Sequence, residues 1–387
     1  MMPLFKSFYA ADSFNPYKRA DDAVTNSGDW MLAVGPICMT FFGLVMVYSA
    51  SLFVASSRGA ADSYYLFRQM LVALASLGAL AVGMTVEPSL YRKYARHLII
   101  IAIILMTIQT IFMPAVKGAK RWFILPGGIM FQTSEFVRMA VIIYVARLVS
   151  DDATIGLTLN KRLLKALVPV LILAAITYFQ RDLSAAAMVA AIAGLILFLA
   201  GMRPKQFWAL TISCAAVAFA FALRTKYQRD RILEFLFPGG SLTAAGYQAY
   251  QSIIGFGCGG VTGAGLGQGK QKMLFLPEPH TDFIYSIIGE ELGLLGASAV
   301  LFAFIFLFLR AISVVKRQSD RFNFLFGGGL IASLLMFALV HMAVTTGLTP
   351  VTGLPLPFIS NGGSSLLISL WSMGVLWNLS RRTSTFD

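Results

Sequence analysis

The chain has 387 residues, of which 57% are hydrophobic and only 13% are charged, and its mean hydropathy is +0.74. Soluble domains carry about 25% charged residues, so the composition excludes an ordinary soluble domain and predicts a protein solvated by lipid. The net charge of +13 does not indicate a nucleic-acid partner, because the basic residues are spread over the loops between apolar segments. The three cysteines lack metal-binding spacing, so no protein metal site is predicted.

Apolar segments of about 20 residues, each long enough to cross a bilayer as a helix, follow one another along the chain. They cover residues 30–54, 70–86, 98–116, 134–148, 164–179, 184–200, 207–223, 282–309, 325–345 and 364–379. We therefore expect an all-α, ten-span membrane bundle over residues 30–379. A polar tail at 1–29 precedes it, without the pattern of a cleaved signal, and a short tail at 380–387 follows it.

The loops between these segments predict the orientation. If the N-terminus is inside, the segments on its side hold more Lys and Arg than those on the other side, so both ends are expected in the cytoplasm. Two outer loops are nevertheless basic: the one around Lys120 and Arg121, and the long one at 224–281. Membrane topology does not require these charges outside, so they favour an anionic, lipid-linked ligand at the outer face.

The long outer loop ends in Leu276-Pro277-Glu278-Pro279-His280-Thr281-Asp282-Phe283, at the start of the eighth segment. An Asp or Thr just before an apolar run is typical of a helix N-cap. A cap explains neither Glu278 and His280 nor the two prolines that present them. An Asp at a membrane surface near apolar walls can also be a general base, and the residue pattern favours cap and catalyst equally.

Glu135 and Arg138 lie three residues apart in the fourth segment, on one helix face. Charges inside a bilayer are costly and usually paired toward the bundle interior, so we expect an ion pair that fixes helix packing and thereby shapes a cavity. Trp122 follows two basic residues at a segment end, which favours an interfacial anchor over stacking on a sugar. Asp182, in a break between two segments, is expected to be a turn or cap residue.

Two further loops have unusual compositions. Residues 255–269 are rich in glycine without a nucleotide-loop signature, which predicts a flexible or closely packed loop, and Lys270 and Lys272 at its end are expected to be free to contact phosphate. Residues 349–365 combine prolines and glycines with apolar side chains, which predicts a re-entrant segment lining a cavity before the last span.

Five motifs resemble those of the SEDS family (shape, elongation, division and sporulation), and their order and spacing make the resemblance specific. They are Gly118-Ala119-Lys120-Arg121-Trp122, Phe131-Gln132-Thr133-Ser134-Glu135, the segment from Leu276 to Phe283, Gly289-Glu290-Glu291-Leu292-Gly293, and Leu356-Pro357-Phe358-Ile359-Ser360-Asn361-Gly362-Gly363-Ser364-Ser365. The resemblance extends over nearly the whole chain, from Val47-Tyr48-Ser49-Ala50-Ser51 to the last span.

The resemblance implies a peptidoglycan glycosyltransferase that polymerises lipid II outside the bacterial cytoplasmic membrane, at the division septum. It implies a class B penicillin-binding protein and other divisome proteins as partners, and Asp282 as the catalytic residue. Taken together, the resemblance and the residue patterns predict a set of substrate-binding residues. They are Lys120, Arg121, Trp122, Glu135, Arg138, Lys270, Lys272, Glu278, His280, Ser360, Gly362, Gly363 and Ser364. Basic side chains or a divalent cation (Mg or Mn) would stabilise the leaving pyrophosphate.

The sequence departs from the family pattern at Thr133, Arg138, Arg181, His341 and Asn361, where Pro, Lys, Pro, Asn and Tyr are usual. The departures leave the motif around Asp282 intact, so the expected activity is kept. A lipid II flippase remains an alternative, because Glu135, Arg138 and the broken segment near Pro357 would suit one. A flippase needs polar groups through the full membrane depth, whereas these residues cluster outside. A non-catalytic divisome scaffold, the other alternative, would tolerate loss of Asp282.

Overall fold

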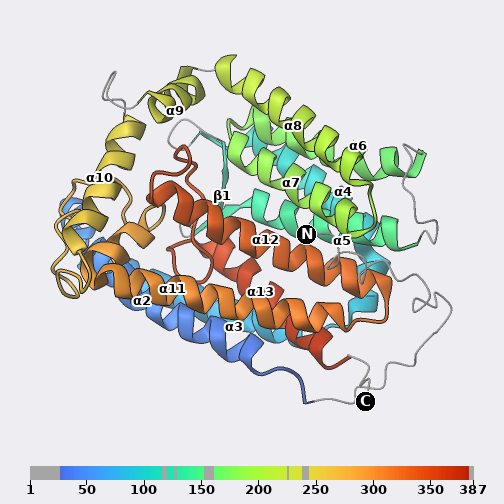
Figure 1. Cartoon of the computed structure of the whole chain (residues 1–387), viewed down its shortest axis with the longest axis horizontal. Coiled ribbons are helices and arrows are strands. Elements are labelled where there is room, and N and C mark those ends of the chain that lie inside the picture. The colour runs from blue at the N-terminus through green and yellow to red at the C-terminus, as the bar shows by residue number, and fades with distance from the viewer. Residues whose placement is uncertain are drawn as a thin grey trace.

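The computed structural model describes residues 27–115, 120–125, 129–151, 161–224, 226–237 and 244–382. Within these ranges the fold is a bundle of long helices that run roughly along the longest axis of the molecule (Figure 1). The long helices are α2 (Met31–Ser57), α3 (Tyr64–Thr85), α4 (Pro88–Phe112), α5 (Thr133–Ser150), α6 (Lys161–Phe179), α7 (Leu183–Leu199), α8 (Pro204–Arg224), α11 (Ile284–Lys316), α12 (Arg321–Thr345) and α13 (Gly363–Ser380).

Each predicted apolar segment coincides with one of these long helices, which confirms the all-α polytopic architecture. Among the described residues, six helices are long and apolar enough to cross a membrane by length and composition: α2, α3, α4, α8, α11 and α12. Helices α6 and α7 contain shorter apolar stretches. Helix α4 begins ten residues before the predicted segment, because Arg92, Lys93 and Arg96 are good helix formers that lower hydropathy without ending the helix.

The long loop predicted at 224–281 contains two further helices, α9 (Lys226–Leu236) and α10 (Ala244–Gly259). Helix α10 packs on α11, where Ser286 Oγ donates to the Ser252 carbonyl at 2.8 Å, and Ser252 Oγ in turn donates to the Thr345 carbonyl at 2.7 Å. The prediction also lacked a small antiparallel hairpin of β1 (Trp122–Leu125) and β2 (Ile129–Gln132), in which Trp122 lies opposite Gln132.

The connections sort into two ends of the bundle. The hairpin, α9, α10 and the segments at 260–283 and 346–362 lie at one end, toward the left of Figure 1, which we call the site end. The links α3–α4, α7–α8 and α11–α12 lie at the opposite end. Large apolar side chains such as Leu71 and Leu74 are about 70% exposed on the outside of the bundle, where lipid would contact them.

Candidate active site

Asp282 lies at the site end, just before α11. The N-cap position of α11 is occupied by Phe283, and no side-chain capping bond is made there, so Asp282 is not the N-cap residue. The carboxylate faces Gly353, because a Cβ built on that glycine would lie 3.3 Å from Asp282 Oδ2. Gly353 has φ +70°, a conformation that favours glycine, so the main chain approaches the partly exposed carboxylate closely.

The proline-rich segment at 349–362 packs against the residues that lead into Asp282. Ser360 Oγ donates to the Thr281 carbonyl and accepts from the Leu356 amide, both at 2.8 Å. The Asn361 amide donates to the His280 carbonyl at 2.9 Å. These bonds hold the irregular segment next to Asp282.

Glu278 and His280 face the turn between α2 and α3. Arg58 Nη2 lies 3.3 Å from Glu278 Oε1, and Arg58 Nη1 donates to the Tyr65 hydroxyl at 2.5 Å. The His280 ring packs on the Tyr65 ring at a centroid distance of 4.6 Å and is only 2% exposed. His280 therefore cannot reach a substrate in this structure, and both residues instead anchor the chain that carries Asp282.

The expected ion pair between Glu135 and Arg138 is confirmed. Arg138 Nη2 lies 2.6 Å from Glu135 Oε2, both side chains are 3% exposed, and the guanidinium lies 4.1 Å above the Phe337 ring. The pair lines a small pocket together with Leu354 and Pro355. Since these two residues directly follow Gly353, the pocket and the Asp282 carboxylate border the same stretch of chain.

Two residues of the helix bundle, His341 in α12 and Ser364 in α13, hold the proline-rich segment and its neighbours in place. The His341 ring donates through Nδ1 to the Leu354 carbonyl at 2.8 Å, so this departure from the family pattern positions the pocket wall. Ser364, in the first turn of α13, accepts a hydrogen bond from the Gln132 amide at 2.8 Å. Gly362 and Gly363 form the start of α13. The predicted residues Ser360 and Ser364 thus join the segment to the Asp282 motif and to the hairpin.

The basic residues of the hairpin hold backbone groups. Lys120 Nζ donates to the Thr110 carbonyl at 2.8 Å, and Arg121 Nη2 donates to the Arg181 carbonyl at 2.9 Å. Arg121 Nε also lies 3.4 Å from Asp182 Oδ2. Asp182 is the N-cap of α7 and accepts from the Ala185 amide at 3.1 Å, which confirms its predicted capping role. Trp122, in β1, is half-buried.

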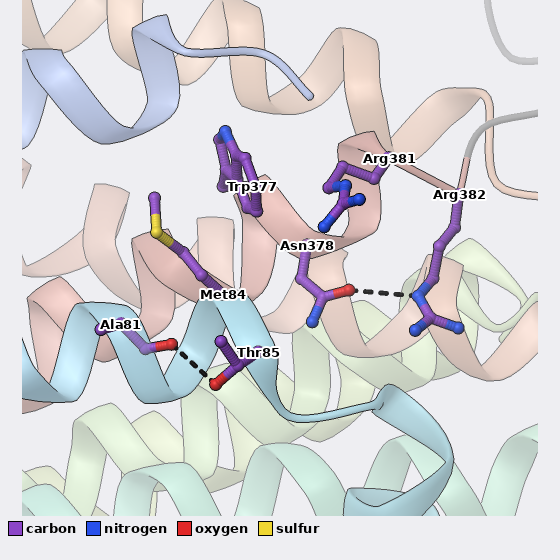
Figure 2. A pocket seen from close by; sticks show the side chains of 7 residues that line it. All are labelled: Ala81, Met84, Thr85, Trp377, Asn378, Arg381 and Arg382. Carbon is purple, nitrogen blue, oxygen red and sulfur yellow. Dashed lines mark hydrogen bonds between the residues drawn. The ribbon is translucent and has the colours of Figure 1, made fainter. Parts of the chain in front are cut away.

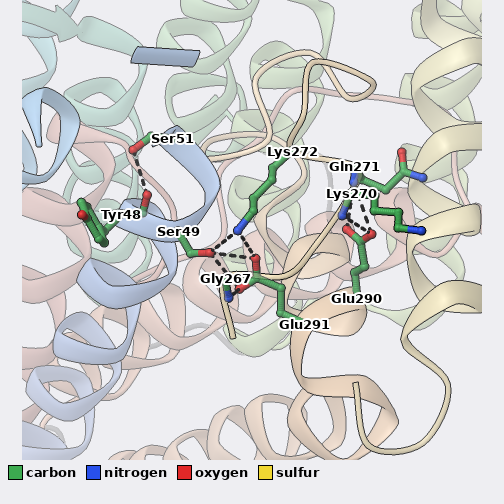
Figure 3. A network of polar contacts seen from close by, with 9 residues as sticks. All are labelled: Tyr48, Ser49, Ser51, Gly267, Lys270, Gln271, Lys272, Glu290 and Glu291. Atoms are coloured by element: carbon green, nitrogen blue, oxygen red, sulfur yellow. Dashed lines mark hydrogen bonds and ion pairs between the residues drawn. The ribbon is translucent and has the colours of Figure 1, made fainter. Parts of the chain in front are cut away.

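The expectation that Lys272 is free to contact phosphate is wrong. Its side chain is fully buried, and Nζ lies 2.7 Å from Glu291 Oε1 and 2.8 Å from Ser49 Oγ (Figure 3). The Gly267 amide donates to Glu291 Oε2 at 3.0 Å, and Ser49 Oγ donates to the same carboxylate. We call Ser49, Gly267, Lys272 and Glu291 the Lys272 network. By contrast, the side chain of Lys270 is exposed.

The Lys272 network closes a stretch of chain around Asp282. Lys272 and Glu291 are 19 residues apart, and Asp282 lies between them. Next to the network, Glu290 accepts from the amides of Lys270 and Gln271 at 2.7 and 3.2 Å. Two adjacent carboxylates in an apolar segment require buried partners. This signal was present in the sequence at Glu290 and Glu291, but it was not used in the prediction.

The glycine-rich loop is closely packed, which decides between the two predicted alternatives. Helix α11 is kinked at Gly293, with φ +65°. The Leu294 amide donates to the Gly260 carbonyl at 2.9 Å, while the Glu290 carbonyl accepts from the Ala264 amide at 2.9 Å. A side chain at Gly293 would collide with the backbone of Gly263. The glycines thus let the loop satisfy the backbone groups that the kink frees.

Among the described residues there is no group of three or more His, Cys, Asp or Glu side chains able to hold a metal ion. A Mg²⁺ ion bound mainly by substrate phosphates needs only one or two protein carboxylates. Such an ion would therefore be held mainly by phosphate oxygens of the ligand rather than by a cluster of protein carboxylates.

Comparison with known proteins identifies the family. The family model for FtsW, RodA and SpoVE, described as a cell cycle protein, matches residues 29–385. The "Probable peptidoglycan glycosyltransferase FtsW" of Geobacter sulfurreducens is 38% identical over 358 residues, which are 92% of this chain and 95% of that protein. Stage V sporulation protein E of Bacillus subtilis is 32% identical over 359 residues, 92% and 97% of the two chains.

Solved structures share the fold. A chain from a structure titled "Structural coordination of polymerization and crosslinking by a peptidoglycan synthase complex" aligns with a TM-score of 0.76 and 23% identity, covering 93% of this chain and 99% of that one. The rod shape determining protein RodA of Thermus thermophilus aligns with a TM-score of 0.69 and 21% identity, covering 93% and 98%. The resemblance noted in the sequence is confirmed, and the chain belongs to the FtsW, RodA and SpoVE family of cell cycle proteins.

Proposed function

We propose that this protein is a peptidoglycan glycosyltransferase that polymerises lipid II, with Asp282 as the general base. The observation that carries the proposal is the position of Asp282. Its carboxylate is partly exposed at one end of a membrane bundle, precedes the N-cap of α11 and faces the positive-φ residue Gly353. Relatives that align over most of the chain are named as peptidoglycan glycosyltransferases, which supports the same activity here.

The reaction requires one base and one leaving group. The acceptor sugar hydroxyl attacks the anomeric carbon of the donor sugar, and Asp282 takes the hydroxyl proton as the new glycosidic bond forms. The bond to undecaprenyl pyrophosphate breaks in the same step, so the anomeric carbon is inverted, as it is in glycosidases that use a base opposite the leaving group. The lipid tails would remain between the helices, which accounts for a base at the membrane surface.

The leaving pyrophosphate needs positive charge. Lys272 is excluded by its burial, and Lys120 and Arg121 already bind backbone carbonyls. Of the four basic residues expected to contact phosphate, Lys270 keeps an exposed side chain, so we assign it to the leaving pyrophosphate. A divalent cation brought with the pyrophosphate would add charge stabilisation when bound.

The cellular setting follows from the family. We propose that the active site faces outward from the cytoplasmic membrane, that both termini are cytoplasmic, and that the protein acts at the division septum with a class B penicillin-binding protein and other divisome proteins. A structural neighbour comes from a peptidoglycan synthase complex, which supports a partner of this kind.

The test is polymerisation of purified lipid II by the detergent-solubilised protein, with and without its penicillin-binding partner. Asp282→Asn should abolish glycan ladders, because the amide cannot accept the proton at neutral pH. Asp320→Asn is a matched control, since Asp320 is the N-cap of α12 at the opposite end and accepts from the Asn323 amide at 3.1 Å. The control should lose about 1 kcal/mol of stability or less and keep its ladders.

Ladders from Asp282→Asn at the wild-type rate would refute the assignment of the base. If wild type makes no ladders even with its partner and Mg²⁺, the activity itself is refuted. In that case, transport of lipid II by the protein in vesicles would favour a flippase that uses the buried Glu135–Arg138 pair, and its absence would favour a scaffold.

A further inference from the structure

A pocket of about 390 Å³ lies at the opposite end of the bundle, between the last turns of α3 and α13 (Figure 2). Helix α3 contributes Ala81, Met84 and Thr85, and the other wall comes from the end of α13 and the two arginines that follow it. It lies where membrane-spanning helices end, which is the depth of lipid head groups. No part of the proposed reaction uses it.

The pocket is shaped by the packing of the two helices. Gly83 and Gly374 allow the backbones of α3 and α13 to touch, since a Cβ on either glycine would collide with main-chain atoms of the other helix. Beyond this contact, Asn378 Nδ2 donates to the Val86 carbonyl at 2.9 Å, which binds the end of α3. The two walls are therefore held together by a close main-chain contact and by the Asn378 side chain.

Both arginines have defined positions. Arg382 Nε donates to Asn378 Oδ1 at 3.1 Å, and the Arg381 guanidinium lies 5.3 Å from the centre of the Trp377 ring. In Figure 2 the guanidinium of Arg381 points toward Asn378 and the pocket. Both arginines line the same concave site, with their guanidinium groups on either side of Asn378 (Figure 2). Because each is held by its own contact, binding an anion there costs less entropy.

The charge of the pocket is not neutralised by the part of the chain that the structure describes. None of the residues that line it is acidic. The carboxylate of Glu87 is 3.9 Å from Arg382 Nη2, but it is 62% exposed and lies outside the lining. Among the described residues Arg381 has no ion pair within 4.0 Å. A concave site with this excess of positive charge attracts anions.

Part of the remaining lining is apolar and continues onto the lipid-facing side of α3. Ala81, Met84 and the Trp377 ring form the apolar part of the pocket. Beyond them, Leu74 and Val82 are 69% and 51% exposed on α3. A ligand with a phosphate at one end and acyl chains at the other would match this order of polar and apolar surfaces, whereas a small soluble anion would use only the arginines.

We propose that this pocket binds the phosphate of an anionic phospholipid, with Arg381 and Arg382 as its two ligands and the acyl chains along α3. Guanidinium groups bind phosphate oxygens through paired, charge-assisted hydrogen bonds, so both arginines contribute to affinity. The proposal does not depend on the reaction at the site end.

The test is native mass spectrometry of the detergent-solubilised full-length protein titrated with phosphatidylglycerol or phosphatidylcholine. Wild type should bind phosphatidylglycerol preferentially, and Arg381→Gln/Arg382→Gln should weaken this binding about tenfold or more. Arg203→Gln/Lys205→Gln is the matched control, because it removes the same charge from exposed residues at the same end. Its binding should stay within about twofold of wild type, since only screened surface charge is lost.

A second variant distinguishes lipid binding inside the pocket from a general effect of positive surface charge. Ala81→Trp fills the apolar part and keeps both arginines, so it should also weaken phosphatidylglycerol binding. Inorganic phosphate tests whether the arginines bind a free phosphate ion rather than a lipid head group. The proposal is overturned if the two charge variants bind phosphatidylglycerol equally, if Ala81→Trp binds like wild type, or if inorganic phosphate displaces the lipid completely at equal concentration. Lipid II polymerisation by the pocket variants reports on the proposed enzyme separately, because their binding result stands whether or not ladders form.

Discussion

The two ends of the bundle hold their cations in opposite ways. At the site end, Lys272 is fully buried and its ammonium is bound by Glu291 and Ser49. At the opposite end, Arg381 and Arg382 line an open pocket without an acidic residue in its lining. A buried cation whose partners come from other elements fixes the chain, whereas a cation in an open pocket without acidic lining residues is available to a ligand. Burial and pairing, rather than charge alone, separate the two roles.

The largest effect on stability is expected at Lys272. Lys272→Met leaves the Glu291 carboxylate buried without its cation, which should lower the free energy of unfolding by about 3–5 kcal/mol. Glycan ladders should decrease as well, because the Lys272 network closes the stretch that carries Asp282. Thermal unfolding in detergent and the polymerisation rate would measure the two effects.

The double variant Lys272→Met/Glu291→Gln is the control for that experiment. It removes both charges, so most of the lost stability should return. If the double variant is as unstable as the single one, the unpaired Glu291 carboxylate is not the cause of the lost stability. Lys272 would then not act as a structural cation through its ion pair.

The next largest effect on stability and activity is expected at Ser360, whose hydroxyl joins the proline-rich segment to the Asp282 motif. Ser360→Ala removes the bonds to the Thr281 carbonyl and the Leu356 amide, so one part-buried and one buried backbone group lose a partner. The cost should be about 1–3 kcal/mol. We expect kcat to fall about tenfold with little change in KM, because a small displacement of a base slows the chemical step more than it weakens binding.

Ser365→Ala is the matched control for Ser360→Ala, because it removes a buried hydroxyl that has no hydrogen-bond partner in the described structure. It should leave kcat and stability near wild type. An equal loss of kcat in both variants would mean that the segment is sensitive to any truncation, rather than to the bonds at Ser360.

The fold was largely predictable from the sequence, because hydropathy reports directly which segments need lipid, and every predicted segment coincides with a long helix. The position of Asp282 before an apolar helix was also readable. Its environment was not, because Gly353, which it faces, belongs to a segment that sequence spacing does not place. The hairpin, α9 and α10 were missed, since all three are short and lack a membrane-length apolar run.

The error at Lys272 has a specific physical cause. Its partners Glu291 and Ser49 lie 19 and 223 residues away in the chain, so local composition showed a lysine beside a glycine-rich loop and nothing of its burial. The pocket at the opposite end was hidden for the same reason, because Asn378 meets Val86 across 292 residues. Pairings across such separations depend on helix packing, which one sequence does not reveal.

A moderate effect on stability is expected at Asp182, which both caps α7 and forms an ion pair with Arg121. Asp182→Asn keeps a capping oxygen and removes the charge, whereas Asp182→Ala removes both. Loss of the cap should cost about 1 kcal/mol, so the Ala variant should unfold at a lower temperature than the Asn variant. Equal melting temperatures would show that the ion pair, and not the cap, stabilises this turn.

The smallest effect on stability is expected at the opposite end, and it is the sharpest check on the comparison. Arg381→Gln removes a charge that has no ion pair among the described residues and only a ring contact with Trp377. The free energy of unfolding in zwitterionic detergent should therefore change by about 0.5 kcal/mol or less. Added phosphatidylglycerol should raise the melting temperature of wild type more than that of Arg381→Gln, because a ligand stabilises the folded state in proportion to its binding. If the variant is already several degrees less stable without lipid, Arg381 is a structural cation like Lys272, and the two ends hold their cations in the same way.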